Sequence, residues 1–172
     1  MPGPSAESDS PRAPRVDRPE MPAEYGIGKA TDHVDWSHVE ERLNADRVYW
    51  IATVSASGRP RVRPVDGMYL EGVLYVGGAL ETQWVRELAA NPQVSIHLDG
   101  GDDVVIVDGE AEILNGVDAD RAAKLAAISS VKFPEYGMTA DSYGGPGPIA
   151  IRPRKVIAWT SFMKDPTRFT FD

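Results

Sequence analysis

Short runs of β-branched and aromatic residues, each closed by turn-forming residues, limit this chain to a small set of folds. Runs of this kind are typical of strands, and the breaks between them are typical of tight turns. The regular alternation of strand and helix expected of a doubly wound parallel sheet does not occur. We therefore predict a mainly β fold, an antiparallel Greek-key-like barrel of six or seven strands with peripheral helices. The expected strands are residues 48–54, 61–65, 73–76, 94–98, 104–114, 149–151 and 156–160, with turn signals at 55–58, 66–67, 71–72 and 99–103.

Three segments have helical periodicity instead. Residues 35–44 place apolar side chains on one face, and residues 117–129 combine good helix formers with an acidic first turn. A shorter helix is expected after the glycine pair Gly77-Gly78, ending at Asn91-Pro92. A strand, a glycine pair and a helix N-terminus together form a common arrangement for holding a phosphate.

Composition divides the 172 residues into a tail and one domain. Residues 1–24 are rich in proline and in charged and small polar residues, so we expect a disordered tail. Residues 25–172 have the length and apolar content of one globular domain, which we expect to be a single split β-barrel.

Charge and cysteine content narrow the functional classes. A formal net charge of −8 disfavours nucleic-acid binding, which needs a cationic surface. There is no cysteine, and no apolar run approaches the ~20 residues that a membrane helix needs. We expect a cytoplasmic protein with neither a membrane nor a nucleic acid as partner.

Hydrolytic, metal and nucleotide motifs are missing from the sequence. The three histidines, His33, His38 and His97, have no metal-ligand spacing, and we expect no metal site. The sequence contains no G-x-S-x-G element, no Walker motif and no G-x-G-x-x-G fingerprint.

A cluster of arginines is the strongest chemical signal that remains. Arg61 and Arg63 alternate along one predicted strand, so their side chains project from the same face and could hold a phosphate. The competing interpretation is a solvated outer face on which acidic residues pair with these arginines. Thr82, at the start of the short helix, and Arg86, one turn later, would form the second half of an anion site.

A colinear series of segments resembles a known family. The series comprises WIATVSASGRP, LYVG, TQWVRELAANPQVSI, VVIVDGEAE and the closing RKVIAW and PTRFTF, and it spans residues 36 to 171. These segments resemble the pyridoxamine 5′-phosphate oxidase-like split β-barrel family, which includes flavin- and deazaflavin-dependent oxidoreductases.

The resemblance implies a homodimer with cofactor clefts at the subunit interface. It implies FMN, or alternatively the deazaflavin coenzyme F-420, and hydride transfer to or from a small organic substrate. The implied cofactor-binding residues are Arg61, Arg63, Pro64, Val65, Gly78, Thr82, Gln83, Trp84 and Arg86. No catalytic side chain is assigned, although Tyr69 or Tyr75 could deliver a proton, and residues 133–148 could cover the cleft.

The chain departs from the family pattern at two positions of the short helix. Many members have lysine where this chain has Trp84 and asparagine where it has Glu87. A missing ammonium beside a phosphate removes a charged hydrogen bond, worth about 1.5–3 kcal/mol. The alternative function is therefore a non-catalytic dimeric barrel that binds a flavin, haem or another small molecule, or one that has lost cofactor binding.

Overall fold

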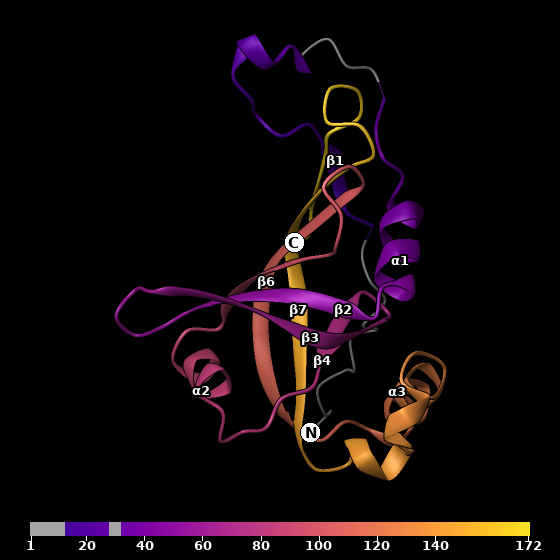
Figure 1. Ribbon diagram of the computed structural model, residues 1–172. Helices are drawn as coiled ribbons and strands as arrows, with labels where there is room; N and C mark the ends of the chain where they lie inside the picture. Colours follow the sequence, from indigo (N-terminus) through magenta and orange to yellow (C-terminus); the bar gives the residue numbers. More distant parts are fainter. Residues whose placement is uncertain (1–12, 28–31) are drawn as a thin grey trace, which may run out of the picture.

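Six antiparallel strands close into a barrel, and two further strands lie outside it (Figure 1). The computed structural model describes residues 13–27 and 32–172. Around the barrel the order is β7-β4-β3-β2-β5-β6, and pairing of β6 with β7 closes the ring. The barrel strands are β2 Val48–Val54, β3 Pro60–Leu70, β4 Val73–Val76, β5 Gln93–His97, β6 Val104–Asn115 and β7 Pro146–Trp159. The predicted antiparallel barrel is confirmed.

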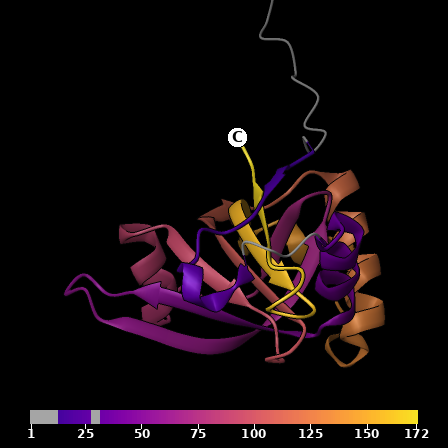
Figure 2. The ribbon, with the colours of Figure 1, turned by 90° about the horizontal axis from the view of Figure 1, so that it is seen from above.

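Three helices cover the barrel, and they lie on two sides of it. They are α1 Trp36–Ala45, α2 Gln83–Ala90 and α3 Ala119–Lys132. In Figures 1 and 2, α1 and α3 lie at one side of the barrel and α2 lies at the other, below the projecting β2–β3 hairpin. All three predicted helices are present, and Asp118 caps α3 by accepting a hydrogen bond of 2.9 Å from the backbone N–H of Arg121.

β3 is longer than predicted, because Asp66 and Gly67 continue the strand instead of forming a turn. Residues 60–66 pair with β2, and residues 67–70 pair with β4. Gly67 is needed here for space: a Cβ at this position would lie 2.2 Å from the ring of Tyr49. A glycine in a strand pattern therefore marks a close approach of a buried aromatic ring.

β7 is one strand where two were predicted. The gap between the two predicted strands contains Pro153, which lies beside a register shift between β6 and β7, opposite Gly109. At such a bulge the regular ladder is interrupted, so a proline, which has no N–H, can be accommodated without the loss of a hydrogen bond between the strands. The end of the chain forms the outer strand β8 Thr167–Thr170, which pairs with β7.

Part of the expected tail is paired with this outer strand. Residues 15–17 form β1 (Arg15–Asp17), which runs antiparallel to β8. Arg168 on β8 donates two hydrogen bonds to Asp17, at 2.6 and 2.9 Å. Residues 15–17 of the expected tail thus have a strand partner and an ion-pair partner, Arg168, that composition does not show; residues 1–12 of that tail lie outside the described part.

Two apolar clusters hold the fold together. The larger one fills the barrel and continues under α1 and α2. The smaller one lies between α3 and the outer face of β3, β4 and β7, and includes Met68, Tyr75, Leu125, Phe133 and Tyr143. The outer side of this part of the barrel is therefore covered, and the cover forms the wall of a cavity described below.

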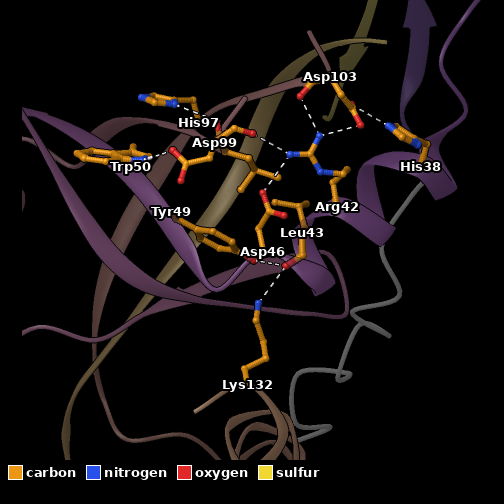
Figure 3. A network of polar contacts seen from close by, with 11 residues as sticks. His38, Arg42, Leu43, Asp46, Tyr49, Trp50, His97, Asp99, Asp103 and Lys132 are labelled. Atoms are coloured by element: carbon orange, nitrogen blue, oxygen red, sulfur yellow. Dashed lines mark hydrogen bonds and ion pairs between the residues drawn. The ribbon is translucent and has the colours of Figure 1, made fainter. Parts of the chain in front are cut away.

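A polar network fixes α1 to the loop between β5 and β6 (Figure 3). The Arg42 guanidinium donates to the backbone oxygens of Asp99 and Asp103, at 2.9 and 2.8 Å, and pairs with the carboxylate of Asp46 at 3.1 Å. His38 bonds the Asp103 carboxylate at 2.9 Å. These bonds satisfy carbonyl groups of a loop that does not pair with a neighbouring strand. Side-chain donors from α1 therefore hold the loop in place of backbone pairing.

Candidate functional site

A cavity of about 390 Å³ opens where β3 changes partner from β2 to β4. Before Gly67, one edge of β3 has no strand beside it, and the chain leaving β4 passes this free edge on its way to α2. We call this space the arginine cavity. Its walls are Val48, Arg63, Pro64, Val65, Asp66, Gly77, Gly78 and Trp84.

Five of the nine residues expected to hold a cofactor lie in these walls, namely Arg63, Pro64, Val65, Gly78 and Trp84. The other four, Arg61, Thr82, Gln83 and Arg86, are not among the lining residues. Thr82 precedes α2, as expected for an N-cap, but its hydroxyl donates to the carbonyl of Ala79 at 2.7 Å. Arg86 donates to the backbone oxygen of Glu81.

Arg63 carries the unsatisfied donor of the cavity. Its Nη1 atom is buried and has no hydrogen-bond partner within the described structure. The guanidinium lies 5.4 Å from the centre of the Trp84 ring, a cation–π contact. Burial lowers the pKa of Arg63, while Glu87 raises it and Arg61 lowers it further. A guanidinium with a buried, unpartnered N–H is a strong site for an anionic oxygen.

Arg61 is paired with an acid of its own chain. Its Nε atom lies 3.5 Å from Oε1 of Glu87, whose side chain is only 9% exposed. Neither atom has a hydrogen-bond partner, so this is an ion pair of poor geometry. The Thr53 hydroxyl is 3.5 Å from the other Glu87 oxygen. The proposed pairing of the strand arginines with acids therefore describes Arg61 but not Arg63.

A second space, of about 270 Å³, adjoins the first. It shares Asp66, Gly77 and Gly78 with the arginine cavity and lies under α3 and the segment 133–148. We call it the apolar cavity. The remaining lining residues are Met68, Tyr75, Val76, Ser129, Phe133, Tyr136, Met138, Ser142, Tyr143, Pro146, Gly147 and Pro148.

Tyrosine hydroxyls supply most of the polar chemistry of the apolar cavity. Tyr136 donates a hydrogen bond of 2.8 Å to the carboxylate of Asp66, at the junction of the two cavities. This bond raises the pKa of Tyr136, and burial raises that of Tyr75. Both phenols are therefore protonated at neutral pH, and the O–H of Tyr136 is donated to Asp66. Tyr69, the other suggested proton donor, instead bonds Glu40 at 2.8 Å and lines neither cavity.

Sequence reasoning missed Asp66 and Gly77 as lining residues. Asp66 was assigned to a turn, although it continues the alternation of Pro64 on one side of β3. Its position beside the glycine pair follows only from the change of strand partner at Gly67. The segment 133–148, which could cover the cleft, contributes to the wall of the apolar cavity and contains the short helices η3 Pro134–Tyr136 and η4 Ala140–Tyr143.

Across residues 13–27 and 32–172, no three histidine or acidic side chains gather in a way that could hold a metal ion. Within the same residues, no helix has the length and apolar character needed to cross a bilayer.

Comparison with known sequences gives one family match and no curated relative. A family profile described as pyridoxamine 5′-phosphate oxidase matches residues 36–160, which include both cavities. A search of curated proteins finds no significant match.

Several solved structures share the fold at low sequence identity. An F-420 reductase is 20% identical, with 68% of this chain and 94% of that chain covered and a TM-score of 0.52. An FAD-binding protein from Mesorhizobium loti is 18% identical, with coverages of 81% and 96% and a TM-score of 0.56. The haem storage protein HutZ from Vibrio cholerae is 20% identical, with coverages of 68% and 88% and a TM-score of 0.54. At these identities the likeness establishes the fold alone.

Proposed function

Because the chain belongs to the pyridoxamine 5′-phosphate oxidase family, we propose that it binds FMN, or alternatively the deazaflavin coenzyme F-420, and transfers hydride between that cofactor and a small organic substrate. The observation that carries this proposal is Arg63, whose buried Nη1 has no partner in a cavity beside the free edge of β3. An F-420 reductase and an FAD-binding protein with the same fold support this class of cofactor.

The residues of the arginine cavity fit a flat ring that carries an anionic group. Arg63 would bind the anion, and the open space beside Gly77, where an added Cβ would meet no atom within 4 Å, would admit it. Gly78 differs, because a Cβ there would lie 2.4 Å from the Trp84 ring. Trp84 thus fills the place next to Gly78 and supplies an aromatic wall, while Pro64 and Val65 would contact the ring of the cofactor.

Hydride chemistry would come from the bound cofactor, as in other flavin-dependent proteins. The chain itself would position the substrate and exclude water. The apolar cavity adjoins the arginine cavity at Asp66 and Gly77, so a substrate there would lie next to the ring. Its walls favour a small, largely uncharged molecule, held by phenol groups of Tyr75 and Tyr136.

We further propose that a second copy of the chain completes the site. Pro64 is exposed and lines the arginine cavity, and its neighbour Val62 is 57% exposed on the projecting β2–β3 hairpin. Burying such apolar groups in a symmetric interface would also close the cavity to water. The family resemblance supports this homodimer, with two equivalent clefts.

The alternative is a dimer that binds a small molecule without catalysis. One structural neighbour, HutZ, is a haem storage protein. Among the described residues that line the two cavities, however, there is no histidine, the most common axial ligand of haem iron. The geometry therefore favours a flavin or deazaflavin over haem.

Purification and titration test the proposal directly. We expect the protein to bind FMN or F-420 with a fluorescence or absorbance change, and the bound cofactor to be reduced and reoxidised by a suitable donor and acceptor. A protein that binds neither compound would refute the proposal. A strong Soret band after addition of haem, without flavin binding, would favour the storage alternative.

A further inference from the structure

We propose that Glu87 makes this site select a singly charged phosphodiester over a doubly charged phosphomonoester. This inference rests on the proposed binding of a flavin or deazaflavin. The two expected cofactors differ in this respect, because FMN ends in a phosphomonoester and F-420 contains a phosphodiester.

Glu87, Arg61 and Arg63 lie together beside the arginine cavity. Glu87 lies on α2 one turn after Trp84, and its carboxylate faces Arg61 across a gap of 3.5 Å. The same Glu87 acts electrostatically on Arg63, as does Arg61. The three side chains therefore form one cluster of two cations and one anion, and only Arg63 lines the cavity.

The charge of this cluster decides what it can neutralise. A phosphomonoester carries a charge of about −1.5 to −2 at pH 7, whereas a diester carries about −1. Two free arginines would match the monoester, but Glu87 offsets one of them. A dianion at Arg63 would also lie close to the buried carboxylate of Glu87, which is only 9% exposed and poorly screened by solvent.

Neither Arg86 nor residue 84 supplies a further positive charge that would offset Glu87. Arg86 is held at the backbone oxygen of Glu81, and Trp84, the aromatic wall of the cavity, carries no charge. The other charged group in the cavity wall is Asp66, a second carboxylate. The surroundings of Arg63 therefore match one negative charge on the ligand rather than two.

The test compares ligands that share one isoalloxazine ring and differ in the phosphate group. Riboflavin, FMN and riboflavin 4′,5′-cyclic phosphate carry no phosphate, a monoester and a diester respectively. Dissociation constants are measured by fluorescence quenching, at fixed ionic strength, for the native protein and for the variants Glu87→Gln and Arg61→Gln. Both substitutions break the same ion pair, so a general loss of stability would affect them alike.

We expect the native protein to bind the cyclic phosphate more tightly than FMN. Glu87→Gln should shift the ratio of the two constants toward FMN by on the order of tenfold, because one repulsive charge is removed. Arg61→Gln should shift the ratio in the opposite direction, because Glu87 is left unopposed. Riboflavin affinity should change little in either variant.

Three results would overturn the inference. They are a native preference for FMN over the cyclic phosphate, a ratio that neither variant changes, and a shift of the same sign in both. If the native protein binds only F-420, Glu87→Gln must gain measurable FMN binding. If riboflavin or F-420 binds but neither variant changes the ratio of the FMN and cyclic-phosphate dissociation constants, this inference alone is removed. If riboflavin, FMN, the cyclic phosphate and F-420 all fail to bind, the proposed function is removed as well.

Discussion

Strands β6 and β7 pair along nearly their whole lengths, whereas β3 changes partner midway, at Gly67. The β6–β7 seam satisfies its backbone groups within the barrel and carries ion pairs on its outer side. The split along β3 leaves a free edge, a buried Arg63 donor and two adjoining cavities. The closed seam thus provides stability, and the incomplete seam provides the space and unsatisfied groups that a ligand requires.

The largest expected effect comes from breaking the closed seam with Gly109→Ala. A Cβ at Gly109 would lie 2.4 Å from the backbone oxygen of Arg152, so the main chain of β7 would have to move. We expect a loss of about 3 kcal/mol in the free energy of unfolding, measured by chemical denaturation. Gly101→Ala is the control, because its Cβ would meet no atom within 4 Å, and it should change stability by less than about 0.5 kcal/mol. Equal stabilities of the two variants would contradict the role assigned to the seam.

A substitution in the arginine cavity, at the split along β3, should change ligand affinity rather than the stability of the fold. Arg63→Met removes the unpartnered donor, and flavin-phosphate or F-420 affinity should fall by roughly tenfold or more, since a hydrogen bond to a charged group is worth about 1.5–3 kcal/mol. The melting temperature should stay the same or rise, because a partly desolvated charge with a buried, unpartnered N–H is lost. Arg59→Met, on the exposed hairpin, is the matched control and should leave titrations unchanged. Equal losses in the two variants would place the anion elsewhere.

The sequence predicts features set by neighbouring residues better than features set by distant contacts, in the closed seam and in the split alike. Strands 48–54 and 73–76 agree with β2 and β4 to the residue, because alternation and flanking turns are local signals. The turn expected at Asp66-Gly67 and the break expected between residues 151 and 156 were wrong, because each depends on a contact distant in sequence, with Tyr49 and with the bulge opposite Gly109.

In the candidate site, too, the local pattern was predictable and the distant contacts were not. The alternation of Arg61 and Arg63 along one strand was predictable, but their different surroundings were not. Glu87, on another element, engages Arg61 and leaves Nη1 of Arg63 without a partner. A pattern of residue types gives the side of a strand, whereas the partner of each charge depends on which helix packs there.

Lys132 gives a smaller, pH-dependent effect at the cover of the apolar cavity. Its ammonium donates to the carbonyl of Leu43 at 3.2 Å and lies 5.3 Å from the centre of the Tyr49 ring (Figure 3). Burial lowers the pKa of Lys132 to about 8, so the folded chain loses this proton more readily than the unfolded chain. Stability should therefore rise as the pH increases from 8 toward 10.

The comparison of native protein with Lys132→Met isolates this contribution. Below pH 8 the native fold holds the buried charge, and above it the cost is progressively removed. The difference in unfolding free energy between the two proteins should change in favour of the native protein between pH 8 and 10, as measured by denaturation at several pH values. A difference that is constant with pH would show that Lys132 keeps an ordinary pKa.

The smallest effect is expected from an ion pair on the outer side of the closed seam. Arg152 and Glu112 are 2.7 Å apart, but their side chains are 47% and 57% exposed, so water and salt screen the attraction. A double-mutant cycle with Arg152→Gln and Glu112→Gln should give a coupling of about 0.2–1 kcal/mol that falls toward zero in about 1 M salt. The same cycle on Arg61 and Glu87 should give a coupling that salt changes much less, because Glu87 is shielded from solvent. If salt weakens both couplings equally, Arg61 and Glu87 are as well solvated as the ion pair on the outer surface. Glu87 would then be too well screened to influence an anion bound at Arg63.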